Sequence, residues 1–449
     1  MTRALINTLR GRGALLALTG ALLLSLTSLA QATKIERVVS PRGIEAWLVQ
    51  DKALPLVSID FAFTGGANQD PADKPGLANM VADLLDEGAG ELDSKAYHER
   101  LEAKAIQLGL STGRDHFRGW LRTLSENRDE AFELLRLALN EPRFDPPEIE
   151  RIRGQIMARL TRETTSPSDI SSKTWWSTAF PGHPYGRPVS GSLDSVPRIE
   201  VADLKGYARR VFARDNLKIA VVGDIDAAGV GAFVDKVFGA LPAKADLTAI
   251  DAARPQGLGR RIVVDLDVPQ AVVAFGGPGI ARKDPDFMAA YVVNHILGGG
   301  SFSSRLYREV REKRGLAYSV HSSLVWLDHA AMLMGGTGTR AERTGETIDI
   351  IEQEIGRLAE SGPTEDELKQ AKSYLKGSYA LGFDTSAKIA GQLVQIQLDD
   401  LGIDYIDRRS GMIDAIGIDD VRRVAKRLLD PGMLVTVVGR PQGVAAKGG

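Results

Sequence analysis

Residues 298–320 read Gly-Gly-Gly-Ser-Phe-Ser-Ser-Arg-Leu-Tyr-Arg-Glu-Val-Arg-Glu-Lys-Arg-Gly-Leu-Ala-Tyr-Ser-Val. The three glycines end an apolar run and leave a backbone that another chain can approach closely. The serines within 301–304 are candidate N-caps for a short helix from about residue 305 to 313. Gly315 is well placed to end that helix. The stretch therefore predicts a glycine-rich loop followed by a helix and a tight reversal.

A strand should follow this reversal, with Leu316, Tyr318 and Val320 on one face because side chains alternate with period 2. Arg311, late in the helix, and Tyr318, early in the strand, then flank the turn and can point into one cleft. A solvated cation at a helix end and a half-buried strand tyrosine are the ordinary structural explanations of these two residues.

The stretch resembles the second-domain signature of the zinc peptidase family of pitrilysin, insulin-degrading enzyme and mitochondrial processing peptidase. In that family an Arg and a Tyr with this spacing hold the substrate backbone near the zinc, and Arg311 and Tyr318 match them. The resemblance implies that both are catalytic residues. It covers nearly all of the chain after the first thirty-odd residues, including the turn-rich loop 183–191. The substrate-binding candidates are Gly298, Gly299, Gly300 and Ser301.

The second half of the chain repeats the first. Segment 201–212 (Val-Ala-Asp-Leu-Lys-Gly-Tyr-Ala-Arg-Arg-Val-Phe) pairs with 418–429 (Ile-Asp-Asp-Val-Arg-Arg-Val-Ala-Lys-Arg-Leu-Leu). The strand 219–223 likewise pairs with 435–439. Runs of strands and runs of helices in each half predict an α+β fold of two homologous domains, each a mostly antiparallel sheet with helices packed on one face.

The expected domain boundaries follow from this repeat. They are 1–32 for a signal peptide, 33–241 for the first peptidase-like domain, 242–259 for a linker rich in Ala, Asp, Pro and Gly, and 260–449 for the second domain.

The first half lacks the zinc motif that the family carries there. His-x-x-Glu-His on a helix places two zinc ligands on one face, with a Glu to activate water. After the lead-in 76–78, the corresponding positions are Asn79, Ala82 and Asp83. The distal ligand position falls at Ala158 or Arg159, where an Arg would repel a cation. We therefore expect no metal in this chain, and the resemblance places the zinc in a partner subunit.

No other metal site is evident from the sequence. None of the six histidines lies three or four residues from another, so no helical ligand pair exists. The adjacent pairs 115–116 and 328–329, each Asp-His, should point their side chains apart if they lie in strands. Ordinary surface or capping roles are therefore expected for the histidines.

Residues 1–32 have the pattern of a secretory signal, with a basic start, an apolar run and Ala-Gln-Ala at 30–32. An uncleaved membrane anchor is the alternative. The absence of cysteine excludes disulfides and thiolate sites, and export without disulfides suits a Gram-negative periplasm. No basic run indicates a nucleic-acid partner, and no later apolar run is long enough to cross a bilayer.

Together these features predict the non-zinc subunit of a heteromeric periplasmic metallopeptidase, inactive alone. The expected partner is a zinc-bearing homologue, in a heterodimer or a larger assembly, and the expected substrates are peptides. The alternative is a non-catalytic peptide-binding or structural subunit. A self-sufficient hydrolase would need a metal site that the sequence does not offer.

Overall fold

The computed structural model describes residues 34–448. The chain divides into a unit of residues 1–36 and a compact unit of residues 37–449, and the elements that build the fold belong to the second. The predicted signal peptide lies outside the described residues. Among the helices that are described, none combines the length and the apolar character that a membrane crossing requires.

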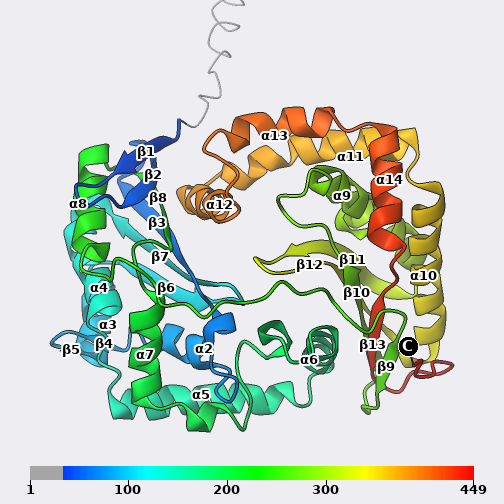
Figure 1. Cartoon of the computed structure of the whole chain (residues 1–449), viewed down its shortest axis with the longest axis horizontal. Helices are drawn as coiled ribbons and strands as arrows, with labels where there is room; N and C mark the ends of the chain where they lie inside the picture. Colours follow the sequence, from blue (N-terminus) through cyan, green and yellow to red (C-terminus); the bar gives the residue numbers. More distant parts are fainter. Residues whose placement is uncertain (1–33, 449) are drawn as a thin grey trace, which may run out of the picture. The chain divides into compact units, whose positions relative to one another are not determined.

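The first half is built on a six-stranded sheet (Figure 1). Its spatial order is β1 (Glu36–Val39), β2 (Glu45–Gln50), β8 (Leu217–Gly223), β3 (Leu56–Thr64), β7 (His116–Leu124) and β6 (Gln107–Thr112). β2 and β8 run parallel, whereas β3 is antiparallel to β7 and β8, and β6 is antiparallel to β7. The sheet is therefore mostly antiparallel.

The second half repeats five of these six strands in the same order, and β1 has no counterpart. Its order is β9 (Arg261–Val264), β13 (Leu434–Val438), β10 (Gln270–Pro278), β12 (Ala331–Arg340) and β11 (Ala317–Trp326). The parallel pair β9 and β13 corresponds to the parallel pair β2 and β8 of the first half. The predicted duplication and α+β class are confirmed, and β11 lies at the free edge of its sheet.

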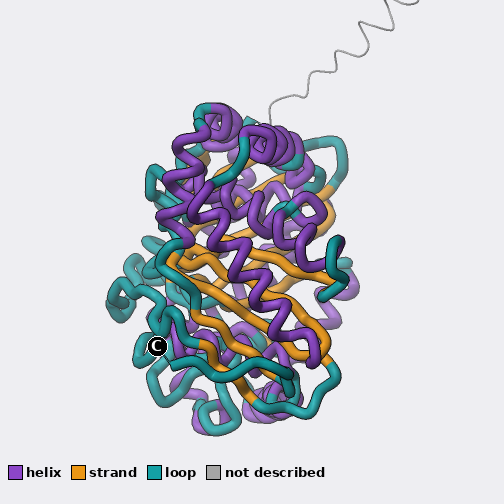
Figure 2. Tube along the Cα trace, turned by 90° about the vertical axis from the view of Figure 1, so that its right-hand side faces the viewer, coloured by secondary structure: helices purple, strands orange, loops and turns teal. Residues whose placement is uncertain are grey.

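Helices cover the outer face of each sheet, and Figure 2 shows this face for the second half, with helices crossing the strands beneath. Those around the first core are α2 (Leu77–Ala82), α3 (Ser94–Ala103), α4 (Arg128–Asn140), α5 (Pro146–Glu163), α7 (Val201–Val211) and α8 (Ala227–Phe238). Those around the second are α9 (Phe287–Asn294), α10 (Thr344–Ser361), α11 (Glu365–Gly377), α13 (Tyr405–Asp414) and α14 (Ile418–Leu429). In α14 the apolar residues recur at helical spacing and are buried.

The two halves also exchange one helix each, which the sequence did not indicate. α6 (Pro167–Ala179) of the first half packs on β10 and β13, and α12 (Ser386–Leu398) of the second half packs on β3 and β8. Trp175 is fully buried and donates its indole N–H to the Leu434 carbonyl at 3.2 Å. Gln397 donates to the Ile219 carbonyl at 2.9 Å. Each sheet is therefore covered on one face by helices of its own half and on the other face by one helix of the other half.

A second link between the halves centres on Asp115, at the start of β7. Its Oδ1 accepts hydrogen bonds from the Tyr185 hydroxyl at 2.6 Å and from the Asn68 amide at 3.0 Å. Its Oδ2 accepts from the backbone N–H of Asp328 at 2.9 Å, and the N–H of His329 donates to the Tyr185 hydroxyl. The tip of the β11–β12 hairpin is thus fixed to the first half, as buried polar groups need partners.

Candidate functional site

The helix expected at 305–313 is present, but most of it is a π-helix, η7 (Tyr307–Glu312). The Ser304 hydroxyl accepts from the Tyr307 backbone N–H, which gives the helix a serine at its start as predicted. At the other end Gly315 takes a left-handed conformation with φ of +59°. A second π-helical turn, η5 (His295–Gly299), lies just upstream. Such turns often occur at functional sites.

The cations of this segment differ in their partners. Arg305 and Arg308 both pair with Glu367, at 2.7 and 3.3 Å. Burial alone would raise the pKa of Glu367, but hydrogen bonds from the Arg305 guanidinium and from the backbone N–H and hydroxyl of Thr364 lower it to about 2. Arg311 has no carboxylate within ion-pair distance among residues 34–448, in contrast to Arg305 and Arg308.

Lys313 and Arg314, in the same segment, also have a carboxylate. Both bind Glu309, at 2.6 and 2.7 Å. Arg311 therefore stands apart from its four cationic neighbours, since its charge is available to a group outside the chain.

Arg311 and Tyr318 are brought together across the reversal, as the spacing predicted. The Arg311 guanidinium lies 4.5 Å from the centre of the Tyr318 ring and 4.9 Å from that of Tyr307. Cation–π contacts of this kind orient a guanidinium without neutralising it. Tyr318 is 81% exposed. The pair is therefore an oriented cation beside an accessible phenol.

The predicted face of Tyr318 is wrong. Leu316 and Val320 are buried, whereas Tyr318 points to solvent. The pairing of β11 with β12 shifts register between Ala317 and Val320, which is a β-bulge. A bulge redirects the side chains of the strand that carries it, so simple alternation fails here. This irregularity is what turns Tyr318 out of the core and towards Arg311.

The glycines upstream pack against their own chain. A Cβ on Gly298 would approach the Ser322 backbone N of β11 to 2.6 Å, and a Cβ on Gly300 would approach the His295 carbonyl oxygen to 2.7 Å. Ser301 has a left-handed φ of +46°, and the next residue, Phe302, is exposed. Glycine is therefore needed for the loop to fold, while peptide binding at Gly298, Gly299, Gly300 and Ser301 stays a prediction.

In the first half, the degenerate motif positions are occupied by internal contacts. Asn79 and Asp83 share a helix face, as expected, and the Asn79 amide donates to the Asp83 carboxylate at 3.0 Å. Ala82 is buried. Burial raises the pKa of Asp83, against opposing effects of the Arg159 charge and of the bond from Asn79. A guanidinium thus lies near the one carboxylate of the motif, and these residues do not fit a zinc ion.

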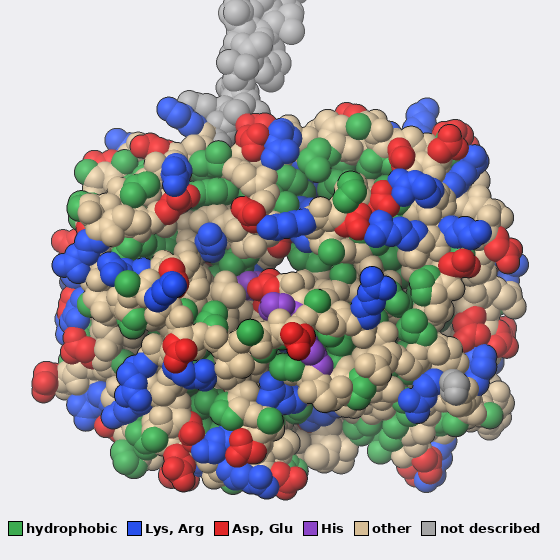
Figure 3. Space-filling model, in the orientation of Figure 1, with side chains coloured by type: hydrophobic (Ala, Val, Ile, Leu, Met, Phe, Trp, Pro, Cys, Tyr) green, Lys and Arg blue, Asp and Glu red, His purple; other side chains and the backbone are tan. Residues whose placement is uncertain are grey.

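The two Asp-His pairs are not independent, contrary to expectation. His116 Nε2 lies 3.3 Å from the Asp328 carboxylate, because the hairpin tip reaches β7. The sequence analysis treated the two pairs separately, because nothing in the sequence indicated that they are in contact. In residues 34–448 no three His, Cys, Asp or Glu side chains are grouped so that they could hold a metal ion. Figure 3 shows one face of the molecule, in the orientation of Figure 1, with histidines gathered at a hollow near its centre.

The same face carries mixed charges. In Figure 3, Lys and Arg are interspersed with Asp and Glu on the face shown and form no broad basic patch there.

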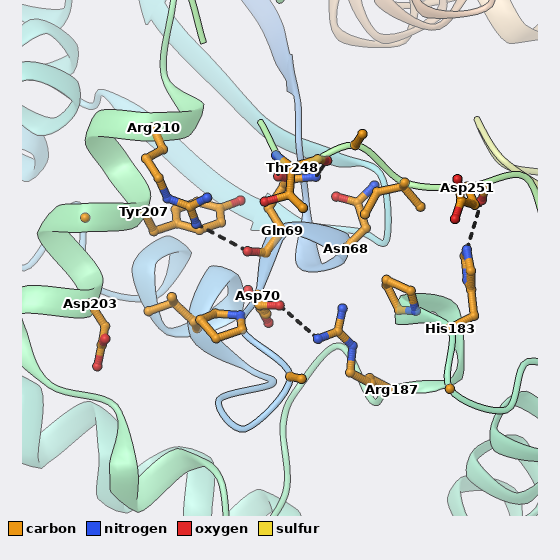
Figure 4. A pocket seen from close by; sticks show the side chains of 18 of the residues that line it. Asn68, Gln69, Asp70, His183, Arg187, Asp203, Tyr207, Arg210, Thr248 and Asp251 are labelled. Carbon is orange, nitrogen blue, oxygen red and sulfur yellow. Dashed lines mark hydrogen bonds between the residues drawn. The ribbon is translucent and has the colours of Figure 1, made fainter. Parts of the chain in front are cut away.

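A pocket of about 670 Å³ lies in the first half, away from the Arg/Tyr pair, between the 68–72 turn, α7 and the segment 248–251 (Figure 4). Its basic side chains are used internally. Arg187 donates to the Asp70 carbonyl, Arg210 donates to the Gln69 carbonyl, and His183 contacts the Asp251 carbonyl. The pocket therefore offers little free chemistry, and Arg311 with Tyr318 is the better candidate site.

Comparisons with known proteins match both halves of the chain. The profile of the insulinase family, peptidase family M16, matches residues 47–192, and that of the peptidase M16 inactive domain matches 198–375. An uncharacterized zinc protease of Streptomyces coelicolor is 28% identical over 418 residues, 90% of this chain and 89% of the relative. A non-peptidase homologue of Helicobacter pylori is 28% identical over 337 residues, 75% and 78% of the two chains.

A solved structure is also similar. The crystal structure of a peptidase M16 inactive domain from Pseudomonas fluorescens superposes with a TM-score of 0.85 at 28% identity. It covers 92% of this chain, and the match includes 100% of that structure. The architecture built from two repeated sheets is therefore shared along the described chain.

Proposed function

Because the chain belongs to peptidase family M16, whose profiles match both of its halves, we propose that it is the non-zinc subunit of a heteromeric peptidase. The observation that carries the proposal is the contrast between the two motif regions. At the positions of the zinc motif, Asn79 is hydrogen-bonded to Asp83 and Ala82 is buried. Arg311, in contrast, has no carboxylate partner in the described chain and adjoins the exposed Tyr318.

The two side chains suit the stabilisation of negative charge on a peptide carbonyl oxygen. A guanidinium and a phenol are both hydrogen-bond donors, and donors held in place before reaction lower the barrier when negative charge develops. The cation–π contacts with Tyr307 and Tyr318 hold the Arg311 guanidinium in one place. Zinc, in a homologous partner, would supply the activated water. This chain would bind and orient the peptide and would be inactive alone.

β11 supports the binding role. It is an edge strand, so its free edge has backbone groups that an extended peptide can pair with. Tyr318 lies near its start. A peptide added along this edge would pass the Arg/Tyr pair. We propose peptides in extended conformation as the substrate class.

The test is reconstitution with a homologue from the same genome that carries His-x-x-Glu-His. Tyr318→Phe removes one hydroxyl, and Arg311→Ala removes the free charge. Each should lower the rate of cleavage of a short unstructured peptide by about 10²–10³-fold, the usual effect of losing one oxyanion-type donor. The loss should appear in kcat if the groups act on the transition state, and in KM if they only position the substrate.

Matched controls are available in the same half. Arg308→Ala removes a cation of the same helix that is already paired with Glu367, and Tyr374→Phe removes another exposed hydroxyl. Both should cleave nearly as the wild type does. Full activity of the Arg311 and Tyr318 variants, with pairing verified by gel filtration, would instead support the alternative of a non-catalytic scaffold or peptide-binding subunit.

We also propose that the protein is periplasmic, on the basis of the signal pattern at residues 1–32. N-terminal sequencing of protein from the periplasmic fraction should find Thr33 first. Recovery of a chain that keeps Met1 in the membrane fraction would contradict export with cleavage.

A further inference from the structure

A separate pocket of about 370 Å³ lies in the second half, where α9, α12 and α13 meet the end of β11. Its walls are rich in aromatic side chains, namely Phe287, Tyr291, Trp326, Tyr379 and Tyr405. Ligand sites for small molecules have this size and are lined mainly by apolar and aromatic groups with a few polar ones. The polar groups here are two arginines, Arg282 and Arg409, with Asp399 and two glutamines.

Arg282 is satisfied within the chain. It lies 3.3 Å from the Asp399 carboxylate and donates to the Tyr405 hydroxyl at 2.8 Å. Its guanidinium also stands 4.3 Å from the centre of the Phe287 ring. The charges of Arg282 and Asp399 offset each other, so this pair orders the pocket wall but leaves no net charge.

Arg409 is different, because it is only 5% exposed and has no carboxylate within ion-pair distance among residues 34–448. Nη1 donates to the Leu375 carbonyl at 3.0 Å, and the guanidinium lies 4.0 Å from the centre of the Tyr379 ring. Nε and Nη2 have no hydrogen-bond partner among the described residues, and neither atom is fully enclosed by the chain, so both can be reached from the pocket. A buried charge is costly unless a counter-charge and hydrogen bonds accompany it.

The unused edge of Arg409 is the edge that binds carboxylates elsewhere in this chain. Arg100 holds Glu130 through Nε and Nη2 at 2.6 and 2.8 Å. Arg305 holds Glu367 through the same two atoms at 2.8 and 2.7 Å. This bidentate geometry matches the two oxygens of a carboxylate.

We propose that this pocket binds a small monocarboxylate that carries an aromatic group, with the carboxylate on Arg409 and the ring against the aromatic walls. The free or C-terminal carboxylate of an aromatic amino acid has this chemistry. A phosphate dianion fits less well, because only one cation is uncompensated and Asp399 lines the same pocket.

The pocket also joins the two halves. Gln395 of α12 donates to Asp399 at 2.8 Å and accepts from Arg118 of β7. Trp326 donates to the same Asp399 oxygen at 3.1 Å. A ligand on Arg409 would thus lie beside a wall that is hydrogen-bonded to the sheet of the first half.

The experiment is calorimetric titration of the purified chain with N-acetyl-L-phenylalanine and with its uncharged amide. The acid should bind and the amide should bind at least about 10-fold more weakly, as expected for a charge-assisted bidentate pair. A short peptide ending in Phe, tested alongside, separates a peptide terminus from a free acid as the source of the carboxylate. Arg409→Gln should weaken binding of the acid by about 10–100-fold.

Two further variants serve as controls for the effect of Arg409→Gln. Arg408→Gln changes the neighbouring arginine of α13, which pairs with Asp404 outside the pocket, and should leave affinity unchanged. Gln392→Trp should block the pocket while keeping Arg409, so it tests the site even if Arg409→Gln folds poorly. No binding of the acid up to about 10 mM, equal affinity for acid and amide, or preferential binding of inorganic phosphate would each overturn the proposal.

Discussion

The two halves of this chain share one sheet topology, yet the two places where the family's site residues fall are built in opposite ways. In the first half, the Asn79 amide donates to the Asp83 carboxylate, and the charge of Arg159 opposes the rise that burial causes in the pKa of Asp83. In the second, Arg311 lies over the rings of Tyr307 and Tyr318 without a carboxylate partner among the described residues, and Tyr318 faces solvent. The comparison suggests that the first place now serves stability and the second serves contact with another molecule. Each claim can be tested by substitution.

One expected effect on stability is at Arg159. Arg159→Met removes the cation that favours the charged form of Asp83, and it should lower the free energy of unfolding at pH 8 by about 0.2–1 kcal/mol, because the Arg159 side chain is 42% exposed. Asp83→Asn in the same chain should recover part of this loss, since the two groups are coupled. Urea unfolding of the single and double variants measures both the loss of stability and its partial recovery.

The same variant sharpens the contrast between the halves. When Arg159→Met is reconstituted with the proposed zinc-bearing partner, cleavage per folded molecule should stay close to wild type. A fall in cleavage as large as that expected for Tyr318→Phe would show that the first-half place still takes part in the reaction, and the comparison would fail.

An effect of similar size is expected at Gly315, which shapes the turn between Arg311 and Tyr318. Its φ is +59°, and an added methyl group would meet no atom within 4 Å, so only the backbone conformation opposes a side chain. Gly315→Ala should cost about 1 kcal/mol, measured by urea unfolding. Peptide cleavage should fall as well, because the turn sets the position of the pair.

Gly377→Ala is the matched control for this prediction. Gly377 is the last residue of α11 and is also surrounded by open space, but its backbone is helical. Alanine favours the helix, so no loss of stability is expected. Equal losses in the two variants would mean that the left-handed turn is not the cause.

The sequence carried much of the architecture but less of the site geometry. The repeat of segment 201–212 at 418–429 predicted two similar domains, and the Arg311/Tyr318 spacing predicted their proximity. The bulge that exposes Tyr318 was missed, because alternation in sequence cannot register an extra residue in one strand. The missed features thus depend on strand register.

The exchange of α6 and α12 was missed for a different reason. The apolar residues of each helix indicate that part of it is buried, but not against which sheet. Contacts between the 115–116 and 328–329 pairs also escaped, since they depend on where a hairpin tip ends in space. Pairing between distant elements is decided by the packed fold, and one sequence alone carries little sign of it.

Two carboxyl groups, one in each half, respond to pH in opposite ways. In the second half, hydrogen bonds from Arg423, opposed by burial and aided by Arg427, lower the pKa of Asp286 to about 2. Its contribution is present above the unfolded value near 3.8 and is lost as the pH falls towards 2. In the first half, burial raises the pKa of Asp60 to about 7, against the charges of Arg122 and Arg118. Oδ2 of Asp60 is buried and has no hydrogen-bond partner in the described residues.

The last prediction is therefore a pH dependence with a defined sign. Between pH 3.8 and about 7 the folded chain keeps a proton on Asp60 that the unfolded chain has lost, so this group lowers stability as the pH rises through that window. Asp60→Asn cannot lose a proton and should remove this decline. The variant should gain in urea midpoint relative to wild type from pH 4 to pH 8. Asp286→Asn is the opposite case and should lose most of its cost only near pH 2. A constant difference between wild type and Asp60→Asn across this range, or a relative loss at pH 8, would show that the Asp60 carboxylate is already charged in the fold and is stabilised there by Arg118 and Arg122.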